Sequence, residues 1–201
     1  MIYDATWVGR ALVQPGLTAS WIVGGALYRS LGRIDASFGA TSWEDALAWL
    51  CSVEPASRID EVQFWGHGTW GRLWIGRDRL DVDAVVDATH SRHADLLALR
   101  ARVRGPASLL WFRSCETFGR ELGHRFAAAW AGFFRCRVAG YTYVIGPWQS
   151  GLHSLAPGQE PTWPVREGLP DDVAEPAHAL MSGPLQPNTI SCLHGQIPEG
   201  Y

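Results

Sequence analysis

Two residues that could do nucleophilic chemistry follow two apolar segments of the chain. His67 stands between Gly66 and Gly68, directly after the β-prone run EVQFW, and Cys115 comes three residues after the run SLLWF. A free thiol has a reference pKa of about 8.5 and is only slightly ionised near neutral pH. A nearby imidazole can accept its proton or stabilise the thiolate. The two residue types therefore predict a cysteine nucleophile assisted by histidine, if the fold brings them together.

The fold must supply two neighbouring strands that run in the same direction. Glu61–Trp65 and Ser108–Phe112 are short and largely apolar, as buried strands are. Parallel strands end at one edge of a sheet, where open α/β folds build their sites. We therefore expect His67 and Cys115 to face each other at this edge. Backbone amides near Gly68 and Cys115 are then candidates to bind a developing oxyanion.

The remaining chain alternates between apolar strands and helices with one apolar side. Expected strands cover 2–8 and 136–145, expected helices cover 18–31, 42–50, 81–104 and 119–134, and a short extended segment covers 72–76. This order predicts an α/β fold, a three-layer sandwich with a mostly parallel central sheet. We divide the chain into an α/β domain at 1–155 and a Pro/Gly-rich extension at 156–201 that packs on the same domain.

The composition indicates which partners and which cellular compartment to expect. The 201 residues carry a net charge of −3, which gives no general reason to expect nucleic-acid or membrane binding. The sequence has no apolar run of membrane-spanning length and no signal-peptide pattern at its start. Its four cysteines are far apart and match no zinc spacing. We expect free thiols in a reducing cytoplasm, no metal and no organic cofactor.

The segments VQFWGHG (Val62–Gly68) and LLWFRSC (Leu109–Cys115) resemble the motifs of caspases, metacaspases, legumains, gingipains, clostripain and separase. The resemblance is closer to a bacterial caspase-like domain of unknown function, and it extends through HGTWGRLWIG (His67–Gly76), SCETFGRELGHRF (Ser114–Phe126) and CRVAGYTYVIG (Cys136–Gly146). It implies a caspase-like fold and a cysteine endopeptidase that cleaves a protein or peptide substrate. His67 and Cys115 would be its catalytic dyad.

Arg113 is a candidate specificity residue. In clostripain-like and metacaspase-like proteins, an Asp two residues before the nucleophile lines the pocket that selects basic substrates. This chain has Arg113 at that position, on the same strand face as Cys115. The resemblance therefore implies a preference for an acidic residue before the scissile bond, through bidentate pairing. The alternative is a structural ion pair of Arg113 with Glu116 or another carboxylate.

Further substrate-binding candidates are Glu116 and the segment Trp148–Ser150. The resemblance implies that loops after the third strand build the substrate groove, with Trp148 as a wall and Gln149 or Ser150 as backbone contacts. The alternative is an ordinary covering loop. Asp60, Glu61 and Glu116 are the nearest candidates for orienting His67.

Other functions remain open from the residues alone. The alternative for Cys115 is a buried structural thiol, and the alternative for His67 is a turn histidine bonded to backbone. The domain would then be a catalytically inactive caspase-like module that binds peptides or self-associates. A different Cys-His enzyme, such as an acyl hydrolase, is a weaker alternative because the Gly-x-Ser/Cys-x-Gly elbow is missing. We interpret His90, His93 and His124 as surface or capping residues, and Cys192 and His194 as structural.

Overall fold

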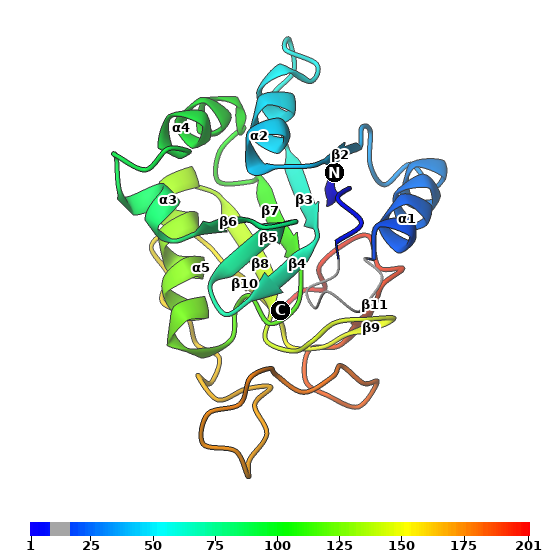
Figure 1. The fold of residues 1–201 in the computed structure, drawn as a ribbon, viewed down its shortest axis with the longest axis vertical. Coiled ribbons are helices and arrows are strands. Elements are labelled where there is room, and N and C mark those ends of the chain that lie inside the picture. Colours follow the sequence, from blue (N-terminus) through cyan, green and yellow to red (C-terminus); the bar gives the residue numbers. More distant parts are fainter. Residues whose placement is uncertain (9–16) are drawn as a thin grey trace.

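A six-stranded sheet forms the centre of the molecule (Figure 1). The computed structural model describes residues 1–8 and 17–201. Five strands of the sheet are parallel, and the sixth pairs antiparallel at one edge. In spatial order they are β10 (Leu152–Leu155), β8 (Arg137–Tyr141), β7 (Leu109–Arg113), β3 (Glu61–Trp65), β1 (Ile2–Asp4) and β2 (Phe38–Ala40). The predicted α/β fold with a mostly parallel sheet is confirmed.

Helices flank this sheet, and in Figure 1 α1 lies to its right while α3, α4 and α5 lie to its left. The helices are α1 (Thr18–Ser30), α2 (Trp43–Ser52), α3 (Asp83–Val86), α4 (His93–Arg102) and α5 (Arg120–Phe134). Alternate residues of a strand point to opposite faces. Phe64 therefore packs in the main core with α2 to α5, whereas Trp65 packs with Tyr28 of α1. On the same face as Trp65, Trp111 packs with Ile190 from the far end of the chain.

The helix at Thr18–Ser30 forms despite two interior glycines, which normally weaken helices. A Cβ atom on Gly24 would lie 2.6 Å from the ring of Trp65, and one on Gly25 would lie 2.9 Å from the Met1 side chain. The glycines therefore let α1 approach the sheet closely, and packing offsets their low propensity. At α2, Ser42 caps the helix, because its Oγ accepts from the Asp45 amide at 3.1 Å.

The single helix predicted for 81–104 is wrong. The segment instead holds the end of β6 (Asp78–Asp81), then α3 and α4. The Asp87 carboxylate accepts hydrogen bonds from the amide and hydroxyl of Thr89, and Nδ1 of His90 accepts from the Arg92 amide. Such local side-chain-to-backbone bonds compete with helical ones and interrupt the helix here.

The structure contains several short strands that the sequence did not predict. The segment predicted at 72–76 is the middle strand of a small antiparallel sheet of β4 (His67–Thr69), β5 (Arg72–Ile75) and β6. Strands β2 and β10 of the main sheet were not predicted, and the strands expected at 2–8 and 136–145 end earlier, at Asp4 and Tyr141. Near the carboxyl end, β9 (Trp148–Gln149) pairs antiparallel with β11 (Ile190–Ser191).

Candidate active site

The two strands that carry the candidate dyad are neighbours. Strands β3 and β7 pair in parallel, and the last pair in their register joins Trp65 to Arg113. His67 and Cys115 each follow two residues after this pair. The predicted arrangement, with the two strands side by side and parallel, is confirmed. Both residues therefore lie just beyond the carboxyl ends of their strands, on the same side of the sheet's end.

Direct backbone packing joins the two segments beyond the strands. A Cβ atom on Gly68 would lie 2.7 Å from the carbonyl oxygen of Cys115 and 2.9 Å from Cβ of Ser114. Real Cβ atoms do not approach other atoms so closely, so only glycine fits between β4 and the turn after β7. The His67–Gly68 backbone therefore lies directly against the turn that begins at Ser114.

The turn after β7 is held by hydrogen bonds to the end of β8 and to the residues that follow it. The amide of Glu116 donates to the carbonyl of Tyr143 at 2.8 Å, and the amide of Phe118 donates to Tyr141 at 2.9 Å. Glu116 has a φ of 48°, a left-handed conformation that side chains other than glycine seldom adopt. This turn reverses the chain sharply after Cys115 before α5 begins at Arg120.

Cys115 and His67 are both partly exposed to solvent. The Sγ atom of Cys115 lies 3.9 Å from the carbonyl oxygen of Ile145, toward which the thiol donates. The ring of His67 packs edge-on against Trp21 of α1, with 5.3 Å between the ring centroids. Cys136 contrasts with Cys115, because it is fully buried and burial raises its pKa to about 11. Cys115 is therefore no enclosed core thiol.

The carboxylate of Glu116 is buried and faces the carboxyl-terminal part of the chain. It accepts a hydrogen bond from the amide of Ala179, and Nδ1 of His178 lies 2.9 Å from its other oxygen. Glu116 therefore fastens the turn after Cys115 to residues 178–179. The prediction that Glu116 contacts substrate stays a prediction.

Arg113 is buried among aromatic rings. The centre of its guanidinium lies 4.5 Å from the ring centroid of Trp111, 5.0 Å from that of Trp65 and 5.2 Å from that of Tyr28. Such cation–π contacts are stronger when the charge is removed from water. The three rings enclose the positive charge at the carboxyl end of β7, on the sheet face that α1 covers.

The hydrogen bonds of Arg113 go to neutral groups. Nη2 donates to Oε1 of Gln149 at 2.9 Å, and Nη1 donates to the hydroxyl of Tyr28. Both nitrogens also donate to backbone carbonyls, of Cys192 at 3.1 Å and of His194 at 3.2 Å. No carboxylate of residues 1–8 or 17–201 forms an ion pair with it, so the alternative of a structural ion pair is wrong.

The segment Trp148–Ser150 lies close to Arg113. Trp148 is 44% exposed, whereas Gln149 and Ser150 are buried. Besides Arg113, Gln149 binds Tyr141, whose hydroxyl donates to Oε1 at 2.7 Å. Ser150 donates from its amide to Ser182 and from its hydroxyl to Gly183. The structure thus joins Arg113 to Gln149, two residues for which substrate contacts stay a prediction, and it places Tyr28, which the sequence pattern did not indicate, against Arg113.

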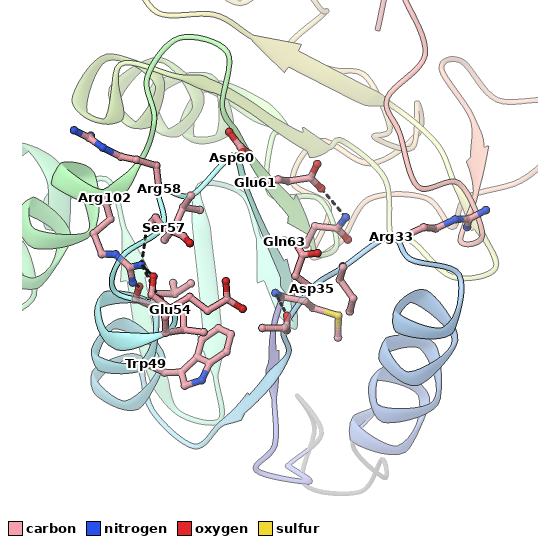
Figure 2. Close-up of a pocket in the computed structure, with 16 residues that line it drawn as sticks. Arg33, Asp35, Trp49, Glu54, Ser57, Arg58, Asp60, Glu61, Gln63 and Arg102 are labelled. Carbon is pink, nitrogen blue, oxygen red and sulfur yellow. Dashed lines mark hydrogen bonds between the residues drawn. The ribbon is translucent and has the colours of Figure 1, made fainter.

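Asp60 and Glu61 are not near His67, so the expectation that they orient its ring is wrong. Both precede or begin β3, whereas His67 follows its end, and at about 3.3 Å per residue the separation is roughly 20 Å. Asp60 forms an ion pair with Arg104 at 2.6 Å, and Gln63 donates to Glu61. Figure 2 shows Asp60, Glu61 and Gln63 around a cavity of about 310 Å³, at the end of β3 opposite to His67.

No protein-family model, no curated protein and no solved structure matches this chain. Across residues 1–8 and 17–201, no helix has the length and apolar content needed to cross a bilayer. Within the same residues, no group of three or more His, Cys, Asp or Glu side chains lies together as metal ligands do. What the chain does must therefore be inferred from its own residues.

Proposed function

We propose that this chain is a caspase-like cysteine endopeptidase with His67 and Cys115 as its catalytic dyad. The observation that carries the proposal is the packing of the His67–Gly68 backbone on the turn that begins at Ser114, at the edge where β3 and β7 end together. Two loops in such contact supply a base and a nucleophile from neighbouring strands, which is the arrangement that thiol activation requires.

The reaction follows from the chemistry of the two groups. Sγ of Cys115 attacks the scissile carbonyl carbon, and His67 takes the thiol proton and passes it to the leaving amine. The peptide C–N bond breaks and a thioester forms on Cys115. Water, deprotonated by His67, then hydrolyses the thioester and restores the thiol. Backbone amides near Gly68 and Cys115 stabilise the oxyanion.

Arg113 selects the substrate in this proposal. Its guanidinium is held by three rings and by Gln149, so it is positioned before any ligand arrives. An Asp or Glu side chain before the scissile bond would replace neutral acceptors with a carboxylate, and charge-assisted bonds are roughly twice as strong. The exposed face of Trp148 forms a wall of the groove.

The test is a peptide library in which the residue before the scissile bond is each of the amino acids in turn. We expect cleavage after Asp or Glu by the unmodified chain, and none by Cys115→Ala or His67→Ala. The variant Leu122→Ala is a matched control, because Leu122 lies on the exposed side of α5 and should cleave normally. Equal cleavage by all four proteins, or none by the unmodified chain, would overturn the endopeptidase proposal.

A second candidate function is a peptide-binding module without catalysis. The observation that favours it is the antiparallel pairing of β9 with β11, because strand addition is a common way to hold an extended peptide. Binding of the library peptides without cleavage by the unmodified chain would support this candidate over the peptidase.

A further inference from the structure

The carboxyl-terminal segment of the chain lies along the proposed substrate groove as an added strand. Ile190 pairs with Gln149 and Ser191 with Trp148, and the amide of Cys192 donates to the carbonyl of Pro147 at 2.8 Å. These are main-chain contacts. Another extended peptide would make the same ones, since every residue except proline has the same backbone groups.

The same segment also accepts hydrogen bonds from the guanidinium of Arg113. The carbonyl oxygen of Cys192 accepts from Nη2, and that of His194 accepts from Nη1. The hydroxyl of Tyr28 lies 2.8 Å and 2.6 Å from these two oxygens. Two oxygens on the two terminal nitrogens of a guanidinium reproduce the bidentate pattern of a carboxylate, but without its negative charge.

The side chains of this segment contribute little to its position. Leu193 is 54% exposed, and the ring of His194 turns back onto the hydroxyl of Ser191. Ile190 is the exception, because it is buried with Trp111 in the sheet core. The chain is thus anchored at Ile190, and the residues after it are held mainly by exchangeable backbone bonds.

Two further hydrogen bonds attach this segment to the rest of the molecule. Arg33 donates to the carbonyl of Leu193, and Oγ of Ser154 on β10 donates to the carbonyl of Tyr201. Ile197 and Tyr201 are only partly buried against the sheet. We name residues 191–201 the strap, because they cross the Arg113 site between a buried anchor and these peripheral contacts.

We propose that the strap is an autoinhibitory contact: it fills the Arg113 site with its own carbonyl oxygens and is displaced when an acidic peptide binds. This rests on the proposed function, because it takes the Arg113 site as the place where the acidic residue of a substrate is recognised. Displacement is favoured because a carboxylate bonds the guanidinium more strongly than two neutral carbonyls do.

Hydrogen exchange of the full chain tests the strap directly. The probes are a short peptide ending in Asp and the same peptide ending in Asn, both added to the Cys115→Ala variant so that no cleavage occurs. We expect the Asp peptide to bind and to speed amide exchange at Cys192 and in the rest of the strap, and the Asn peptide to do neither. If the Asp peptide binds and amide exchange in the strap stays unchanged, the autoinhibition proposal is overturned. The proposals of the dyad and of the acidic preference would not be affected by that result.

A variant that loosens the strap gives a second readout. Cys192→Pro removes the amide that bonds Pro147, and we expect it to bind the Asp peptide about three- to tenfold more tightly, since one such bond is lost from the competing state. Leu193→Ala is the matched control and should bind like the unmodified chain. Equal affinities for all three proteins, or no Asp binding by any of them, would refute displacement. The dyad is tested separately, by alkylation of Cys115 in the unmodified chain.

Discussion

Gly68 packs so closely on Thr117 that a Cβ atom at position 68 would lie 2.4 Å from the threonine Oγ1. That hydroxyl is itself bonded to Ser114 at 2.6 Å and cannot move away without loss. Gly68→Ala should therefore lower the free energy of unfolding by about 1–3 kcal/mol, the usual cost of overpacking. It should also slow alkylation of Cys115, because the two loops separate. Chemical denaturation measures the first effect and peptide mapping the second.

Gly132→Ala is the control for this change. Gly132 lies in α5, and nothing stands within 4 Å of its Cβ position. Alanine there should stabilise the protein by about 0.5–1 kcal/mol, since it is the better helix former. If Gly68→Ala were as stable and as reactive as Gly132→Ala, the close packing of the two loops would be contradicted.

Arg113 should matter both for recognition and for stability. It is a buried cation without a carboxylate partner among the described residues, and three rings surround it. Its guanidinium donates to Oε1 of Gln149 and to the carbonyls of Cys192 and His194, and a thioether would leave these acceptors without that donor. Arg113→Met should therefore lower the free energy of unfolding by about 1–3 kcal/mol and abolish binding of the Asp peptide.

The control for Arg113 is an exposed arginine. Arg79 pairs with Asp81 at 3.0 Å and is half exposed, so Arg79→Met should affect stability little and Asp-peptide binding not at all. Titration calorimetry with the Asp peptide measures the binding. Retained affinity in Arg113→Met would exclude Arg113 as the acidic-recognition residue.

Glu116 should act by positioning the turn after Cys115. Its buried carboxylate accepts from both Ala179 and His178, and an amide could accept at only one of its two polar atoms. Glu116→Gln should therefore lower the free energy of unfolding by about 1–3 kcal/mol and slow Cys115 alkylation. Glu44→Gln, at an exposed surface ion pair with Arg92, should do neither. Equal behaviour of the two variants would argue against this role.

His124 should make stability depend on pH. The sequence suggested a surface or capping role, but its ring packs edge-on against Trp163 at 5.0 Å, and burial lowers its pKa. The unfolded chain, with a His pKa of about 6.5, then binds protons more readily than the folded one. The stabilisation from neutral His124 is present above that pH and is lost as pH falls below it. Thermal unfolding of His124→Gln between pH 7 and pH 5 should show a smaller fall in Tm than the unmodified chain, and an equal fall would refute the assignment.

The strands that carry His67 and Cys115 could be predicted because their signals are local. Each is a short apolar run that ends at a glycine or polar turn, and two such runs in an alternating chain pair in parallel. The break near Asp87 could not be predicted from apolar spacing, because it depends on side chains that bond the nearby backbone.

The surroundings of Arg113 were beyond prediction for another reason. Its partners Tyr28 and Gln149 lie 85 and 36 residues away along the chain. The two carbonyl oxygens that it binds leave no sequence signal at all, because every residue carries one. The position of Arg113 followed from strand alternation, whereas its partners followed only from the tertiary structure.

The pH profile of Cys115 alkylation tests the dyad most directly. Iodoacetamide labelling, resolved by peptide mapping, compares Cys115 with Cys136, whose pKa burial raises to about 11. We predict that Cys115 reacts with a midpoint below that of an ordinary thiol, about 8.5, and that His67→Ala moves the midpoint up toward that value. A Cys115 profile that is unchanged by His67→Ala, with labelling no faster than at Cys51, a partly exposed thiol of α2, would contradict the dyad.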